Sequence, residues 1–402
     1  MLTKLIWLMA GAFAIGTEGF VIAGILPAVS RDLHVTIAQA GHLVMAFAFT
    51  YAIAAPVTAT LTASWPFGRQ LRLAMGGFTL ANVIAALAPG FTALLIARVL
   101  LALFAGLFMA AAGSYAAASS EPSRRGRALA LLYMGMTAAT VLGVPLGTWV
   151  GNSFGWRATF WMIGLLSLVS LLGLTRLRPL TVPWPVPSLR ERLRIAARPD
   201  VLMTLGVTLV CFAGIFAVYT YLSPLLRLVA GLSDDGVALA LLSFGVCGAI
   251  GNLLGGHMAD RFGALRVGGL ALAALGLVQA GLAWVAHAAP PQVAVYLVFG
   301  LIMAWGVVGW SFPPVQQVTL VQQAPQAVSV VLSLNASAMY FGIALGAWFG
   351  SLVVAAERSE GLTHPLWVRR GAQRFAEQGS QLVERVEFGE TPRHGGTAGC
   401  HR

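Results

Sequence analysis

The feature that most constrains this chain is a series of apolar stretches, each about 20 residues long, the length that a helix needs to cross the hydrocarbon core of a bilayer. Eleven such segments can be delimited in the 402 residues. They lie near 5–27, 39–62, 71–89, 91–118, 128–152, 157–177, 201–224, 236–257, 265–288, 292–315 and 328–355. In a bilayer a helix satisfies its own backbone hydrogen bonds. We therefore predict an all-α polytopic membrane protein with eleven spans.

The composition excludes several other classes of protein. Hydrophobic residues make up 58% of the chain and charged residues only 10%, whereas soluble domains carry about 25% charged residues. The cysteines Cys211, Cys247 and Cys400 show no paired spacing, which argues against a disulfide framework or a cysteine zinc site. No phosphate-binding glycine–lysine motif occurs. We expect no catalytic residues, no bound metal and no cofactor, and so no enzyme.

The basic residues predict an orientation. With the N-terminus in the cytoplasm, 14 Lys and Arg residues up to position 355 fall in cytoplasmic segments and 3 fall outside. These cations face anionic lipid headgroups, so the net charge of +11 does not require nucleic acid as a partner. Residues 178–200 are rich in proline and arginine and form a predicted cytoplasmic linker. A short amphipathic helix is expected at 188–197, on the membrane surface.

An internal repeat divides the chain on either side of this linker. Glycines recur at four-residue steps in the fifth segment of each half, where small residues allow helices to approach closely. These glycines are Gly143, Gly147 and Gly151 in the first half and Gly342, Gly346 and Gly350 in the second. Two halves related by a parallel repeat are a known transporter plan. We predict an N-terminal bundle at 1–177 and a C-terminal bundle at 201–355.

Five short motifs make this plan specific. They are GTEGFVIAGILP at 16–27, ARVL at 97–100, GVPLG at 143–147, GWRATF at 155–160 and ADRFG at 259–263. In this order and spacing the chain resembles the major facilitator superfamily, and within it the twelve-span drug:proton antiporters near the arabinose-efflux-like permeases. The resemblance implies two six-helix bundles around a central site. It also implies a monomer that moves a small-molecule substrate by alternating access.

Two ionisable residues lie well inside predicted spans. Glu18 and Arg98 each lie roughly 10–12 Å below the outer end of their helix, at 1.5 Å per residue, so an ion pair is geometrically possible. A carboxylate in an apolar cavity protonates more readily, and intramembrane ionisable residues commonly mark functional sites. In the family that the chain resembles, the arginine of this motif is associated with proton coupling. The alternatives are a structural hydrogen bond for Glu18 and a packing or headgroup anchor for Arg98.

Two glycine-containing motifs predict conformational roles. Gly143, Pro145 and Gly147 combine close packing with a proline that permits a kink, which suits a bendable interface between the halves; plain helix packing is the alternative. The resemblance makes this motif typical of antiporters. Gly256, Asp260, Arg261 and Gly263 resemble the cytoplasmic gate of the superfamily, although a solvated charged loop would look the same. In the first half Trp65 and Pro66 replace the gate charges.

The resemblance places the substrate cavity between segments 1, 4, 7 and 10. Aromatic walls suit amphipathic or cationic solutes, although such rings also pack in cores or face lipid. The candidate lining residues are Phe212, Phe216, Tyr219, Trp305, Trp310 and Asn335.

From residue 356 the chain becomes polar, and no apolar run long enough for a twelfth span remains. We expect that helix 12 has been lost or replaced by an atypical tail at 356–402. The predicted function is proton-coupled efflux of a small solute across a bacterial-type inner membrane, with the proton as coupling ion. A proton symporter, a facilitated uptake carrier and an inactive ligand-binding membrane protein remain open.

Overall fold

The computed structural model describes residues 2–62, 64–121, 125–176 and 189–359. The first half contains α1 (Leu2–Asp32), α2 (Ile37–Leu61), α3 (Phe67–Ala86), α4 (Phe91–Ala118), α5 (Arg125–Ala138), a π-helical turn (Ala139–Gly143), α6 (Val144–Phe154) and α7 (Trp156–Leu174). The second contains α8 (Leu189–Ala196), α9 (Pro199–Tyr219), α10 (Leu222–Ala230), α11 (Asp234–Phe262), α12 (Ala264–Ala288), α13 (Pro291–Gln323), a 3₁₀ turn (Pro325–Ala327) and α14 (Val328–Ser359). No strand occurs among these residues, so the predicted all-α class is confirmed.

Ten helical stretches of the described residues are long and apolar enough to cross a membrane, one fewer than predicted. The predicted span that is missing from these ten is α3, which is a helix but carries Arg69, Gln70 and Arg72 in its first turns. These polar side chains lower its mean hydropathy. The helix nevertheless packs along its length against α4 and α7. Within the described residues, every one of the eleven predicted segments is helical.

Local signals start and stop several of these helices. Thr36 and Gln39 form a capping box at the start of α2, in which the Thr36 hydroxyl accepts from the backbone N–H of Gln39 at 3.1 Å. At the start of α11 the Ser233 hydroxyl accepts from the Gly236 backbone amide at 3.2 Å, a cap without the reciprocal bond. Gly263, with φ of 89°, ends α11 and allows α12 to begin at the next residue. A side chain there would strain the backbone.

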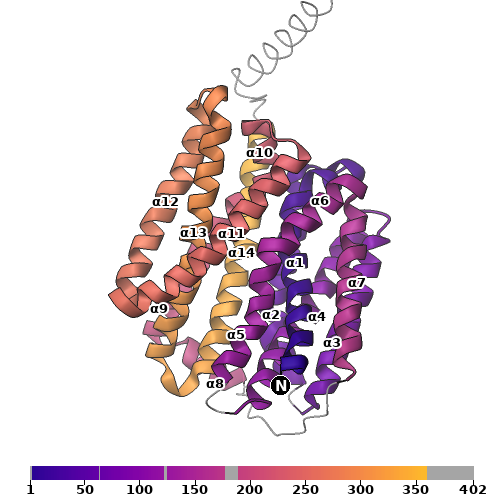
Figure 1. Ribbon diagram of the computed structural model, residues 1–402, viewed down its shortest axis with the longest axis vertical. Helices are drawn as coiled ribbons and strands as arrows, with labels where there is room; N and C mark the ends of the chain where they lie inside the picture. The colour runs from indigo at the N-terminus through magenta and orange to yellow at the C-terminus, as the bar shows by residue number, and fades with distance from the viewer. Residues whose placement is uncertain (1, 63, 122–124, 177–188, 360–402) are drawn as a thin grey trace, which may run out of the picture. The chain divides into compact units, whose positions relative to one another are not determined.

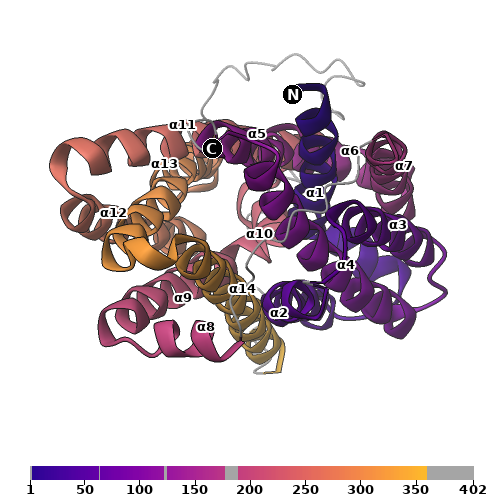
Figure 2. The same ribbon diagram turned by 90° about the horizontal axis from the view of Figure 1, so that it is seen from below.

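Within residues 1–356 the helices of the first half gather on one side and those of the second half on the other (Figures 1 and 2). Helix α1 packs against α2, α5, α6 and α7 of its own half, and against α10 and α11 of the other. It therefore lies where the halves meet, and so do the residues in its middle. The predicted linker helix is present as α8.

The two glycine stripes occupy equivalent places in the halves. In α6 a Cβ on Gly147 would lie 2.7 Å from Val21, and one on Gly151 2.5 Å from Ile25, both on α1. In α14 a Cβ on Gly350 would lie 2.6 Å from the Ala217 carbonyl oxygen of α9. The fifth predicted segment thus packs on the first in each half, which supports the internal repeat.

The π-helical turn between α5 and α6 explains how Pro145 fits inside a long helix. Proline has no amide hydrogen to donate within a helix. Just before it, the Val144 amide bonds the Ala139 carbonyl, a wider turn than in an α-helix. This segment lies between the halves, as predicted, because both the turn and α6 pack against α11 of the second half. Its glycines face α1 of their own half, and Thr140 of the turn lies against Gly245 of α11.

The polar tail predicted at 356–402 and the loss of helix 12 fall mainly on residues 360–402, outside the described residues. Residues 178–188 of the predicted linker also lie outside them, whereas 189–200 contain α8 and the start of α9. The polar tail and the loss of helix 12 stay predictions.

Candidate functional site

A buried ion pair joins two helices of the first half. Glu18 comes from α1 and Arg98 from α4, and Arg98 Nη1 donates to Glu18 Oε1. Both side chains are fully buried. Removing two charges from water is costly unless they neutralise each other and form further hydrogen bonds. Glu18 and Arg98, which the sequence places at equal depth in the membrane, therefore form an ion pair in the structure.

Additional contacts hold Arg98 in place independently of the carboxylate. Its Nε donates to the Leu43 carbonyl at 3.1 Å, and Nη1 donates to the Glu18 carbonyl at 3.3 Å. The guanidinium also lies 4.4 Å from the centre of the Phe47 ring, a cation–π contact. These contacts tie Arg98 of α4 to both α1 and α2. The arginine can therefore keep its position when the carboxylate changes its charge.

One atom on each side of the pair is left without a partner. Glu18 Oε2 and Arg98 Nη2 are buried, and neither has a hydrogen-bond partner among the described residues. Buried polar atoms are almost always hydrogen-bonded, so two unsatisfied atoms in one ion pair are unusual. Oε2 is an acceptor that a proton can occupy without displacing any other bond.

A row of aromatic rings leads from this pair to the second half. Phe47 stacks on Tyr51 within α2, with ring centroids 6.2 Å apart. Tyr51 stacks on Tyr340 of α14 at 3.9 Å. The charged pair is thus connected by packed rings to a helix of the opposite half.

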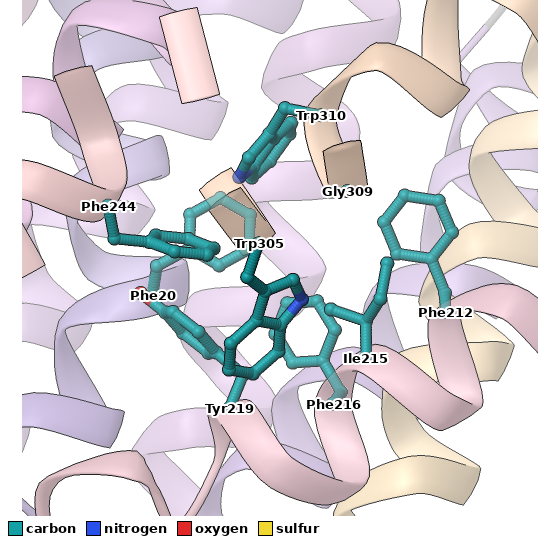
Figure 3. Close-up of a pocket in the computed structure, with 9 residues that line it drawn as sticks. All are labelled: Phe20, Phe212, Ile215, Phe216, Tyr219, Phe244, Trp305, Gly309 and Trp310. Atoms are coloured by element: carbon teal, nitrogen blue, oxygen red, sulfur yellow. The ribbon is translucent and has the colours of Figure 1, made fainter. Parts of the chain in front are cut away.

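A second cluster of rings encloses a small cavity, which we name the aromatic cage (Figure 3). The cavity has a volume of about 10 Å³, enough for roughly one water molecule. The residues of the cage are Phe20, Phe212, Ile215, Phe216, Tyr219, Phe244, Trp305, Gly309 and Trp310. Only Phe20 comes from the first half, and its ring lies 6.0 Å from that of Phe216 and 6.1 Å from that of Trp310.

The cage contains five of the six cavity residues predicted from sequence, namely Phe212, Phe216, Tyr219, Trp305 and Trp310. Asn335 lies elsewhere, because its amide oxygen accepts a hydrogen bond from Thr208 at 3.0 Å and so ties α14 to α9. Four residues of the cage were not predicted from the sequence, namely Phe20, Ile215, Phe244 and Gly309. Phe20 stands two residues after Glu18 on the same predicted helix, a signal that could have pointed to it. Phe244 comes from segment 8, not from segment 4, which the resemblance had named.

The predicted gate residues lie together at the end of α11. Asp260 and Arg261 are exposed, and within the described part of the chain neither forms an ion pair, although Arg261 lies over the Phe262 ring at 5.3 Å. The close helix contact belongs to Gly255, where a Cβ would overlap the Ser311 carbonyl, whereas at Gly256 it would stay 4.0 Å from Pro314.

The first-half copy of this motif is held differently. Gln70 is buried, and its side-chain amide donates to the carbonyls of Thr62 and Trp65, both at 2.9 Å. The Arg69 guanidinium lies 4.5 Å from the Trp65 ring centre. The connection between α2 and α3 is therefore fixed by an uncharged side chain in place of the absent charges.

No group of three or more His, Cys, Asp or Glu residues in the described part of the chain is arranged to hold a metal ion. The chemistry of the site is limited to the ion pair, the unpaired atoms and the rings.

Comparison with known proteins identifies the family. The model of the Major Facilitator Superfamily matches residues 8–347. The chain belongs to the major facilitator superfamily. Together with the ten candidate spans, this membership makes it a multi-pass protein of a bacterial-type inner membrane.

Individual transport and resistance proteins are similar over more than half of the chain. The inner membrane transport protein YdhP of Escherichia coli (strain K12) is 34% identical over 353 residues, covering 88% of this chain and 89% of that protein. A chloramphenicol resistance protein of Streptomyces lividans is 35% identical over 252 residues, covering 62% and 64%. An inward-facing bacterial homologue of the lysosomal transporter Spinster has the same fold, with a TM-score of 0.71, 21% identity and coverage of 89% and 84%.

Proposed function

We propose that this superfamily member exports a small solute in exchange for protons by alternating access. Membership of the superfamily supports transport. Similarity to a chloramphenicol resistance protein supports export. The observation that carries proton coupling is the buried ion pair of Glu18 and Arg98 with its unpartnered Oε2 atom.

Protonation changes the energy of this pair in a defined way. With the proton absent, Glu18 is neutralised by Arg98, and the two charges attract strongly in their apolar surroundings. A proton on Oε2 removes the negative charge and this attraction, while Arg98 keeps its bonds to two carbonyls. The pair thus has two states that differ mainly in how firmly α1 is held to α4.

The position of Phe20 links this change to the solute site. Glu18 and Phe20 are on the same helix, and Phe20 closes the aromatic cage from the side of the first half. A shift of α1 on proton binding moves this ring relative to Phe216 and Trp310. Opening of the cage then follows the protonation state, which is the requirement for exchange.

The test uses inverted membrane vesicles energised to an acidic lumen and a pH-sensitive dye that acidity quenches. With chloramphenicol as the solute, an exporter carries it into the lumen and protons out, so fluorescence recovers. Glu18→Gln should abolish the recovery. Asp235→Asn, which neutralises an exposed acid at the start of α11, is the matched control and should behave as the unaltered protein.

Other outcomes identify the alternatives. Movement of solute out of the lumen together with protons would indicate symport. Solute flux with no dye response, unchanged by Glu18→Gln, would indicate facilitated passage. Binding without any flux would indicate a ligand-binding membrane protein. Each of these results contradicts proton-coupled export of this solute.

A further inference from the structure

We propose that the aromatic cage selects uncharged aromatic solutes that carry a hydrogen-bond acceptor, with the indole Nε1 of Trp305 as the donor that recognises it. This inference rests on the proposed function for the cage's role in transport. Its physical basis is the set of groups that face the cavity.

The cage contains no charge to match an ionic solute. All nine residues that line it are apolar or aromatic. The nearest acid along the chain, Glu18, is already neutralised by Arg98. A cation would leave water for aromatic faces alone, and a buried charge without a counter-charge is strongly unfavourable. An anion would meet the negative faces of the rings. The cage therefore favours a neutral solute.

Of the polar atoms that the side chains of the cage carry, the Trp305 Nε1 atom is the one that is buried without a hydrogen-bond partner among the described residues. The Trp305 side chain as a whole is fully buried. Indole nitrogen is a donor only, and a buried donor usually finds an acceptor. Figure 3 shows this nitrogen on the edge of the ring nearest to Ile215. A solute oxygen at that place would satisfy the donor.

Gly309 keeps the space beside this nitrogen open. A Cβ at Gly309 would lie 3.5 Å from Trp305 Nε1 and 3.9 Å from Ile215. The methyl group of an alanine would therefore occupy the approach to the donor. The absence of a side chain at this position leaves no Cβ in the way of a solute that approaches Nε1 when the cavity enlarges.

The present volume of about 10 Å³ shows the cage closed around this donor. Phe20 is its only wall from the first half, so separation of the halves removes that wall and enlarges the cavity. Flat rings can then take the place of Phe20 against Phe216 and Trp310. An aromatic body with an acceptor at one edge matches both the stacking surfaces and the donor.

The test measures equilibrium binding to the purified full chain by calorimetry in detergent, with protein-free micelles subtracted. Four probes share one ring system: 2-acetylnaphthalene, which has an acceptor; 2-ethylnaphthalene, which has none; the cation of 2-(aminomethyl)naphthalene; and 2-naphthoate. We expect 2-acetylnaphthalene to bind most tightly. One hydrogen bond corresponds to an advantage of about three- to tenfold over 2-ethylnaphthalene.

Variants then assign the preference to Trp305. Trp305→Phe keeps a ring but removes the donor. It should lower the ratio of the affinities for 2-acetylnaphthalene and 2-ethylnaphthalene to about one, while the affinity for 2-ethylnaphthalene stays the same. Gly309→Ala should also remove the preference for the ketone, because its methyl group covers Nε1. This variant tests the inference if Trp305→Phe does not fold. Trp284→Phe, the same substitution at a side chain 57% exposed on α12, should change neither affinity.

Four results would overturn the inference. They are tighter binding of either ion, equal binding of the ketone and the hydrocarbon, a ketone preference that survives both variants, and binding of none of the probes. Because no proton gradient or flux is involved, these outcomes do not depend on whether the protein exports solutes.

Discussion

The ring of Tyr51 in α2 stacks on that of Tyr340 in α14 with centroids 3.9 Å apart, and this stack joins the two halves of the protein. On the first-half side, Tyr51 packs on Phe47, which lies beneath the Arg98 guanidinium. The contact between halves is therefore two rings away from the buried ion pair. A change in the pair can reach the opposite half through packed side chains.

Removing one ring of this stack should slow transport without breaking the ion pair. Aromatic pairs contribute about 0.5–1.5 kcal/mol beyond buried area, so Tyr340→Ala should change the solute flux by about two- to tenfold. Tyr340→Phe keeps the ring and should stay close to the unaltered rate. Flux into proteoliposomes measures this. Tyr296→Ala, at a ring 78% exposed on α13, is the control. An equal loss in all three variants would argue against a role for the stack.

The ion pair predicts an asymmetric effect on stability. Arg98→Ala leaves a buried carboxylate without its partner and should destabilise the protein by about 3–5 kcal/mol. The double variant Glu18→Gln with Arg98→Met removes both charges and should recover most of that loss, as measured by thermal unfolding in detergent. It should still lack proton exchange. A double variant no more stable than Arg98→Ala would contradict the pairing.

The glycine stripe of α14 predicts a packing effect at Gly346. A Cβ there would overlap the Ala213 carbonyl oxygen on α9, so Gly346→Ala should destabilise by about 1–3 kcal/mol through overpacking. Gly206→Ala on α9 meets nothing within 4 Å and provides the control. It should be neutral or slightly stabilising, because alanine favours helix over glycine by about 1 kcal/mol. Equal thermal midpoints for both variants would show that the helices are not closely apposed.

The loop between α2 and α3 depends on Gln70. Gln70→Ala leaves the carbonyls of Thr62 and Trp65 without this donor and should cost about 1–3 kcal/mol. Faster proteolysis between the two helices, with an unchanged rate at the α11–α12 connection, is the expected readout. Gln279→Ala, at a half-buried glutamine of α12 whose side chain donates to the Gly214 carbonyl of α9, controls for the loss of an amide far from this loop. Unchanged cleavage in Gln70→Ala would remove the proposed role of this side chain.

Much of the fold could be predicted because a bilayer allows few solutions. The length of each apolar segment predicted a membrane-spanning helix, and the glycines at four-residue steps predicted the internal repeat. The prediction of eleven spans included α3 because its C-terminal part is apolar. The whole helix begins with polar residues and is not apolar enough to be among the ten candidate membrane spans of the described residues. The candidate site was predicted in part, since equal depth allowed Glu18 to meet Arg98.

The rest depended on how each helix is rotated about its own axis. A helix that is apolar on all sides carries no period that marks its buried face. Sequence alone therefore determined that the chain crosses a membrane, and that Glu18 and Arg98 are the charges well inside its predicted spans. Tertiary structure decided that they touch, that Phe20 and Phe244 complete the cage while Asn335 does not, and that the first glycine stripe faces α1. Only packing against neighbouring helices fixes those rotations.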